Sequence, residues 1–200
     1  MDSKVLFKIG YGLYVLSARE GEKDNACIVN AVMQVTSEPL QVAVCVNKTN
    51  YTCEMIQQTR KFNISVLAEG VDFEVFKRFG YQCGRNIDKF ADYTDIKRSP
   101  NDVLYITKNS NAFISAYVQQ EIDLGTHVMF VAQLVGGEVL SEKPTVTYEF
   151  YQKNIKPRPQ KTEKSGWRCK ICGYIYEGEE LPSDFICPIC KHGAVDFEKI

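Results

Sequence analysis

Four cysteines near the end of the chain have the spacing of metal ligands. They form two pairs, Cys169 with Cys172 and Cys187 with Cys190, and two residues separate the members of each pair. Fourteen residues lie between the pairs. Two such pairs at this separation place four thiolates at the corners of a tetrahedron around one metal ion. Because a segment this short buries too little apolar surface to fold unaided, a bound metal would supply much of its folding free energy.

The composition of the 200-residue chain fits one ordinary domain followed by one very small domain. Apolar residues make up 44%, enough for a core, and the net charge of −1 gives no sign of nucleic-acid binding. No apolar run is long enough to span a membrane, and we expect neither a signal peptide nor a disulfide scaffold. We therefore expect a cytoplasmic protein. The remaining cysteines are expected to be buried small apolar residues: Cys27, Cys45, Cys53 and Cys83.

Alternating apolar residues predict a mainly β fold for residues 1–150. The clearest example is Val42, Val44 and Val46, which share one face of a strand. Many strands joined by hairpin turns suggest a closed barrel, because closure removes exposed edges. Strands are predicted at residues 13–17, 26–33, 40–47, 62–66, 103–106, 113–122 and 127–135, with a turn at Gly136-Gly137. Short helices are predicted at residues 51–60 and 72–79, and an irregular loop at residues 83–100.

Residues 151–166 differ in composition from both flanking regions. Pro157 and Pro159 disfavour a helix there. The segment is basic: five positive residues and Glu163 give a net charge of +4, the five being Lys153, Lys156, Arg158, Lys161 and Lys164. We predict a semi-extended linker between the first domain and a second domain at residues 167–200.

The C-terminal segment resembles a rubredoxin domain. The resemblance is carried by the CxxCG-Y-x-Y and CPxC sequences, the Asp196-Phe-Glu-Lys ending and four aromatic residues: Trp167, Tyr174, Phe185 and Phe197. It implies one iron ion on four thiolates and single-electron transfer, whereas a structural zinc ribbon has the same ligand spacing. Two departures are the short segment Glu177–Glu180 and Lys191, which stands where rubredoxins usually carry glycine.

Residues 1–150 resemble the flavin reductase-like, FMN-binding split-barrel family. The matching stretches run along the whole domain in order: residues 11–16, 30–39, 46–52, 79–90 and 125–127. The resemblance implies a split β-barrel that binds FMN, NAD(P)H as the electron donor, and a homodimer with the flavin near its interface.

Residues 47–52 have the chemistry of a phosphate site, because a strand there runs into a helix N-terminus with free amides and a favourable dipole. The resemblance implies a flavin-ring wall at residues 30 and 34–37, a second phosphate or ribityl contact at residues 84–89, and a nicotinamide or flavin contact at His127. The predicted cofactor-binding residues are Asn30, Gln34, Val35, Thr36, Ser37, Asn47, Lys48, Thr49, Asn50, Thr52, Gly84, Arg85 and Lys89.

The two resemblances together predict an enzyme with two redox centres. Electrons would pass from NAD(P)H through FMN to an iron centre on four cysteines and on to a redox protein, such as a flavodiiron oxygen or nitric oxide reductase. One alternative is a flavin reductase that releases reduced flavin and carries a structural zinc ribbon. Another is a non-enzymatic electron carrier reduced by a separate reductase.

Overall fold

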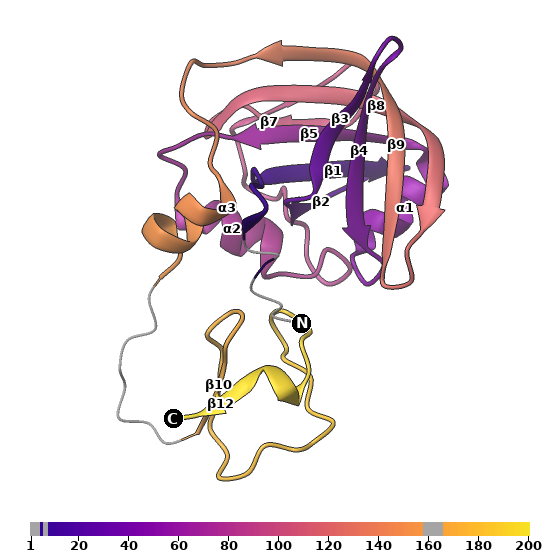
Figure 1. Ribbon diagram of the computed structural model, residues 1–200. Helices are drawn as coiled ribbons and strands as arrows, with labels where there is room; N and C mark the ends of the chain where they lie inside the picture. Colours follow the sequence, from indigo (N-terminus) through magenta and orange to yellow (C-terminus); the bar gives the residue numbers. More distant parts are fainter. Residues whose placement is uncertain (1–4, 6–7, 158–165) are drawn as a thin grey trace. The chain divides into compact units, whose positions relative to one another are not determined.

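A computed structural model describes residue 5 and residues 8–157 and 166–200. The chain divides into two compact units, residues 1–156 and residues 157–200. The first unit is built on one seven-stranded sheet that curls on itself, with the strand order β2-β1-β5-β8-β9-β4-β3 (Figure 1). Its strands are β1 (Tyr14–Glu20), β2 (Lys23–Val29), β3 (Val32–Ser37), β4 (Leu40–Asn47), β5 (Lys61–Leu67), β8 (Ser110–Asp123) and β9 (His127–Val139).

The sheet is split rather than closed. Strands β2 and β3 are consecutive in the chain but stand at opposite ends of the strand order. At Asn30 the chain turns, and the Val32 amide donates to the Asn30 carbonyl at 3.1 Å. Among the described residues no ladder joins β2 to β3, so the closed barrel expected from the strand pattern is wrong in this respect. The split barrel implied by the family resemblance is the architecture found.

Two apolar clusters form the core of the first unit. One packs α1 (Tyr51–Thr59) on the sheet through Met55 and Ile56. The other lies around α2 (Phe73–Gly80), whose hydrophobic face buries Phe76 and Phe79. Burial of these helices follows from their apolar residues three and four positions apart.

The end of the first unit reaches further than residue 150. Residues Tyr148–Phe150 form α3 and Tyr151–Ile155 form a single π-helical turn, η2. Tyr151 is buried, with its ring centroid 4.5 Å from that of Phe76. The first residues of the predicted linker are therefore helical, because Tyr151 packs on α2. Residues 158–165 of that linker lie outside the described residues.

Other element boundaries also differ from the sequence expectation. The predicted strand 26–33 is divided between β2 and β3. The turn between β1 and β2 includes Gly21, whose φ of 57° favours glycine. Strand β9 continues through Gly136-Gly137, which pair with Ser115 and Ile114 of β8. A side chain at position 137 would lie 2.8 Å from the Phe113 carbonyl, so glycine permits this close pairing where the sequence suggested a turn. The predicted loop contains β6 (Ile96–Arg98), which pairs with β7 (Leu104–Ile106).

The second unit is a small ribbon with the strand order β11-β10-β12. Its elements are β10 (Trp167–Cys169), β11 (Ile175–Tyr176), the 3-10 turn η3 (Ala194–Asp196) and β12 (Phe197–Lys199). None of the helices in the described part of the chain is long and apolar enough to cross a membrane.

Candidate functional site: a thiolate cluster and an anion cradle

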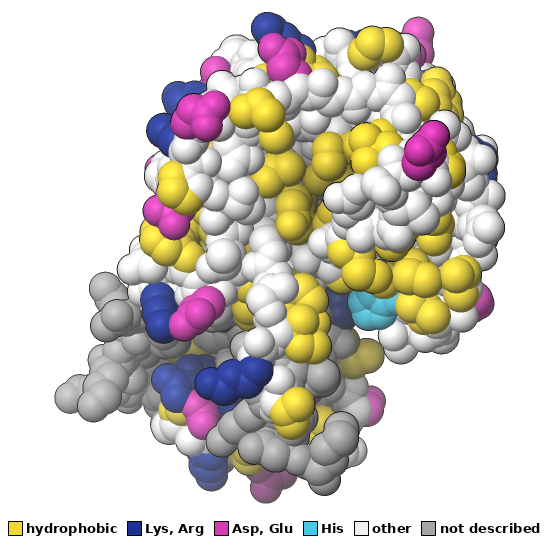
Figure 2. Space-filling view, turned by 45° about the horizontal axis from the view of Figure 1, so that its top comes forward, with side chains coloured by type: hydrophobic (Ala, Val, Ile, Leu, Met, Phe, Trp, Pro, Cys, Tyr) yellow, Lys and Arg dark blue, Asp and Glu magenta, His cyan; other side chains and the backbone are white. Residues whose placement is uncertain are grey.

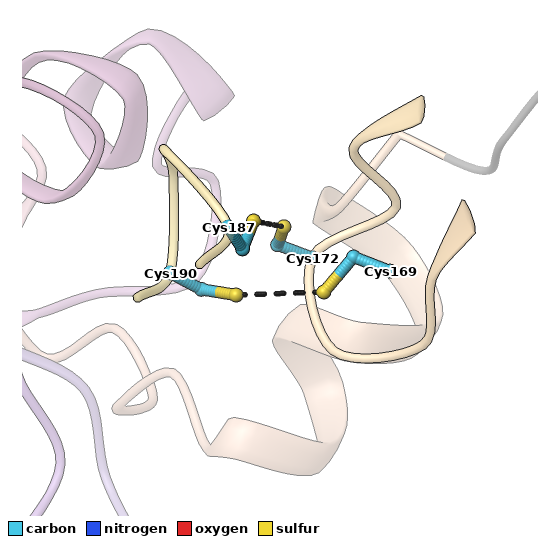
Figure 3. Close-up of side chains that lie close together, drawn as sticks. All are labelled: Cys169, Cys172, Cys187 and Cys190. Atoms are coloured by element: carbon cyan, nitrogen blue, oxygen red, sulfur yellow. Dashed lines mark hydrogen bonds between the residues drawn. The ribbon is translucent and has the colours of Figure 1, made fainter. Parts of the chain in front are cut away.

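The four cysteines of the predicted metal site converge in the second unit (Figure 3). The sulfur atoms of Cys169 and Cys190 are 3.5 Å apart, those of Cys172 and Cys187 are 3.4 Å apart, and all four lie within 4.8 Å of one another. Disulfides need about 2.05 Å, so these are four separate thiols. Metal–sulfur bonds of about 2.3 Å in a tetrahedron separate the sulfur atoms by about 3.8 Å. The cluster therefore fits one tetrahedral metal ion.

The two cysteine pairs sit on backbone turns of the same construction. The amide of Gly173 donates to the Cys169 carbonyl at 2.9 Å, and the amide of Lys191 donates to the Cys187 carbonyl at 3.0 Å. Gly173 has φ of 80° and Lys191 has φ of 62°. The lysine thus keeps the turn that glycine provides in the first pair, at a conformational cost of about 1 kcal/mol.

Backbone amides also stabilise negative charge on the sulfur atoms. Burial raises the pKa of the Cys172 thiol to about 11, although the Tyr174 amide acts against it. Burial acts in the same direction on Cys187, but hydrogen bonds from the amides of Cys190 and Ile189 and from the thiols of Cys172 and Cys190 together lower the pKa of that thiol. Metal binding to this cluster must displace the protons of the thiols whose pKa is raised.

An aromatic shell surrounds the thiols. Cys169 and Cys187 are buried, whereas Cys172 and Cys190 are partly exposed. The cluster includes all four aromatic residues expected from the sequence: Trp167, Tyr174, Phe185 and Phe197. Such a shell keeps water from the inner sulfur atoms, while the outer pair leaves a short route for an electron to the surface.

The predicted phosphate segment lies where β4 ends and α1 begins. The Asn47 Oδ1 atom accepts hydrogen bonds from the Thr49 amide and the Thr49 hydroxyl, each at 2.9 Å. The side chain of the N-cap residue Asn50 makes no capping hydrogen bond. The Cys53 amide donates to the Asn50 carbonyl at 2.9 Å. The amides before it are of the kind that a helix leaves without an internal partner, so this terminus without a side-chain cap fits an anion.

Strand pairing brings His127 to the same place. His127 lies opposite Asn47 in the β4–β9 ladder, and the Lys48 amide donates to the Thr126 carbonyl at 3.0 Å. The Thr126 hydroxyl is 2.9 Å from His127 Nδ1. His127 and residues 47–50, far apart in sequence, therefore share one end of the sheet.

Sequence reasoning missed Asp123 at this end of the sheet. Lys48 Nζ donates to both carboxylate oxygens of Asp123, at 2.6 and 2.7 Å. The hydrogen bond from Lys48, followed by one from the Gly125 amide, lowers the pKa of Asp123. Its signal in the sequence is its place in the turn that leads to Gly125-Thr-His127.

The predicted loop at residues 84–85 contacts α1. The Arg85 guanidinium forms an ion pair with Glu54 and lies 4.5 Å over the Tyr51 ring. Lys23 lies 4.8 Å over the same ring. Tyr51 and Lys23 were not predicted, because a cation–aromatic stack between three segments leaves no local pattern. A pocket of about 550 Å³ adjoins Arg85, lined by Glu22, Lys23, Asp24, Arg85, Asn86, Ile87, Asp88 and Phe90.

Three predicted cofactor-binding residues are buried, and each of them contacts another part of the protein: Thr52, Gly84 and Lys89. The Thr52 hydroxyl accepts from Asn25 Nδ2 at 3.0 Å, and Gly84 packs against the same asparagine. Lys89 Nζ donates to the carbonyls of Ala26 at 2.8 Å and Phe79 at 3.0 Å. Burial lowers the pKa of Lys89.

The predicted flavin-ring wall is less compact. Asn30 is close to the phosphate segment, because the Cys45 amide donates to the Ala31 carbonyl at 3.0 Å. Residues 34–37 lie exposed on the edge strand β3, where Ser37 pairs with Leu40 at the far end of β4. Leu40 is about 23 Å from Asn47 along an extended strand. Within one chain, Thr36 and Ser37 are therefore not brought to the phosphate segment.

Comparison with known proteins agrees with this geometry. Residues 6–157 match the family described as Flavin reductase like domain, and residues 167–198 match the Rubrerythrin, rubredoxin-like domain. The chain is 34% identical, over 100% of both chains, to the high molecular weight rubredoxin of Moorella thermoacetica. It is 35% identical to the ferric-chelate reductase (NAD(P)H) of Archaeoglobus fulgidus, over 81% of this chain and 95% of that one.

A solved structure shares the fold of the first unit. Nitrilotriacetate monooxygenase component B from Mycobacterium thermoresistibile aligns with a TM-score of 0.62 and 23% identity, over 70% of this chain and 75% of that chain. Both resemblances seen in the sequence are thus confirmed. The chain belongs to the flavin reductase-like family, carries a C-terminal rubredoxin-like domain, and is an electron-transfer oxidoreductase.

Proposed function

We propose that this protein passes electrons from NAD(P)H, through FMN held by the first unit, to one iron ion on four cysteines and then to an acceptor protein. The observation that carries the proposal is a cluster of four thiols within 4.8 Å of one another in the same chain as a flavin reductase-like domain. When bound, the flavin supplies the conversion between two-electron and one-electron chemistry, and the iron supplies a one-electron carrier.

The start of α1 would hold the flavin phosphate. The amides and dipole of the helix N-terminus favour an anion, and the Thr49 hydroxyl is held there by Asn47. Lys48 adds a positive charge, which Asp123 holds in place until an anion competes for it. Arg85 completes the set, and Asn30 with Gln34 and its neighbours would line the flavin ring.

His127 would contact the nicotinamide or the flavin. Its Nδ1 atom is engaged by the Thr126 hydroxyl, so its other ring nitrogen, Nε2, is the one that would meet a ligand. This assignment follows from the position of His127 opposite Asn47 at the proposed phosphate end.

Iron rather than zinc is proposed for the thiolate cluster. The buried aromatic shell and the amides directed at the sulfur atoms suit a redox centre, whose potential depends on both. The acceptor is proposed to be a redox protein such as a flavodiiron oxygen or nitric oxide reductase.

A homodimer is also proposed. Hydrophobic side chains gather on one face of the first unit (Figure 2). Exposed apolar residues on β3, β4 and β9 include Met33, Val35, Leu40, Val135 and Val139. Two of them, Met33 and Val35, lie on the edge strand β3 that would carry the flavin-ring wall, so a second copy could complete what one chain leaves open.

Anaerobic spectroscopy of the purified full-length protein tests the main proposal. Flavin bands and ferric-thiolate bands should both be present, and NADH or NADPH should bleach both. A colourless metal site with a reducible flavin would favour the flavin reductase with a zinc ribbon. A flavin that neither nucleotide reduces would favour a carrier that depends on a separate reductase. Light scattering of the same sample tests the dimer.

A further inference from the structure

A buried lysine in the loop after Gly84 has a role that cofactor contact does not explain. Lys89 is 4% exposed, and its ammonium donates to the carbonyls of Ala26 and Phe79 at 2.8 and 3.0 Å. An ammonium has three donors and no acceptor. Two of the three N–H donors of Lys89 are thus bonded to main-chain oxygen atoms of other segments.

Both carbonyls lie at positions where the regular secondary structure provides no hydrogen-bond donor. Ala26 lies on β2, an edge strand, and edge strands present carbonyls that no neighbouring strand satisfies. Phe79 lies in the last turn of α2, where carbonyls have no partner inside the helix and a positive charge is favourable. Lys89 therefore ties the loop to a strand edge and a helix end together.

The other end of the same loop is fixed by close packing. Gly84 is buried, and a Cβ atom there would lie 2.0 Å from the Oδ1 atom of Asn25. Asn25 is itself 2% exposed and donates to Thr52 of α1 at 3.0 Å. Two consecutive residues of β2, Asn25 and Ala26, thus hold both ends of the segment from Gly84 to Lys89 and the start of α1.

The held segment presents Arg85. Arg85 is exposed, yet its guanidinium is ion-paired with Glu54 and lies 4.5 Å over Tyr51, both in the first turns of α1. Guanidinium groups bind phosphate through two parallel hydrogen bonds, provided that they are held in orientation.

We propose that Lys89 is a positioning residue: it does not touch the cofactor but fixes the 84–89 loop so that Arg85 reaches the phosphate of FMN at the start of α1. This inference rests on the proposed function. It changes the expectation from family resemblance that Lys89 contacts the cofactor itself.

Flavin titrations of the full-length chain, freed of flavin, test the inference. Lys89→Met keeps the unbranched side chain up to its fourth atom and removes the ammonium. We expect its Kd for FMN to rise on the order of tenfold and its Kd for riboflavin, which has no phosphate, to change by about twofold or less. Lys77→Met, at an exposed lysine of α2, is the matched control and should leave both values unchanged. Equal losses for FMN and riboflavin would overturn the inference.

A double-mutant cycle separates positioning from contact. If Lys89 acts through Arg85, the Lys89→Met/Arg85→Met protein should bind FMN within about twofold of Arg85→Met alone. Losses that multiply would show that Lys89 makes its own contribution to binding and would contradict the proposed role.

Two further measurements apply if Lys89→Met folds poorly or if flavin does not bind. Gly84→Ala, which pushes the loop off Asn25 with Lys89 intact, should give the same FMN-specific loss. Hydrogen exchange of the flavin-free protein should be faster at residues 83–90 in Lys89→Met than in Lys77→Met, and unchanged exchange would refute the anchoring. A wild-type protein that binds neither flavin defeats the proposed function, whereas the exchange experiment still judges the role of Lys89.

Discussion

The two candidate redox sites of this protein are assembled in opposite ways. All four ligands of the thiolate cluster come from residues 169–190, on two turns with the same hydrogen bonds. The proposed phosphate site in the first unit, here called the anion cradle, is formed by residues 47–50, His127 and Arg85. It combines the end of β4, the start of β9, the start of α1 and a loop that β2 anchors. A local site depends on a few backbone angles and on its metal, whereas a distributed site depends on strand register and buried anchors. The two should therefore fail independently.

Removal of one thiol should have the largest effect. Cys187→Ser leaves three sulfur ligands, and because metal binding supplies much of the folding energy of so small a unit, we expect loss of the metal and unfolding of residues 166–200. Optical spectroscopy and metal analysis measure this loss. Cys83→Ser is the control, at a cysteine outside the cluster that is exposed, where the sequence suggested burial. Flavin reduction by NAD(P)H should persist in both variants, and its loss in Cys187→Ser would contradict the independence of the two sites.

The next largest effect is expected in the cradle. Asn47→Ala removes the acceptor that holds the Thr49 amide and hydroxyl, so FMN affinity should fall about tenfold. Fluorescence titration gives the affinity, and Asn154→Ala, at an exposed asparagine, serves as the control. The iron spectrum should not change. An unaltered Kd would remove Asn47 from the phosphate site.

In the second unit, a substitution at Lys191 should have a smaller effect than the two above and should stabilise the protein. Lys191→Gly relieves a left-handed backbone conformation and should stabilise the second unit by about 0.5–1 kcal/mol. Thermal unfolding followed at the iron bands measures the difference. Lys199→Gly, in the extended strand β12, should instead destabilise by a similar amount. If both variants shift the melting temperature in the same direction, the backbone argument fails.

The smallest effect is expected at the exposed pair of Lys48 and Asp123. Asp123→Asn frees Lys48 for the phosphate, so FMN affinity should rise about twofold to threefold, with a steeper dependence on salt. Because Lys48 lowers the pKa of Asp123, the pair persists at neutral pH and is lost only as pH falls through that lowered pKa. The gain should therefore be constant near neutral pH and disappear in acid. A loss of affinity would show that Asp123 helps to position Lys48.

Much of the metal site and part of the cradle were predictable because their interactions are local. Cys169 and Cys172, or Asn47 and Thr49, meet through turns only a few residues long, and residue type with spacing is enough to indicate them. The helix after Asn50 and the strand before it were also predictable from the sequence, since a regular spacing of apolar residues predicts each one.

The remaining features depend on contacts between distant segments. Strand register decides that His127 faces Asn47 and that Lys48 meets Asp123, and no short pattern encodes a register. The split between β2 and β3, the burial of Tyr151 and the two carbonyls around Lys89 arise only when the sheet curls and α2 packs on it. Residue type and spacing are enough to identify the four cysteines and the aromatic residues of the ribbon. Which residues near the start of α1 can meet a ligand, and which hold the others in place, follows from the folded chain, because burial and main-chain partners exist only there.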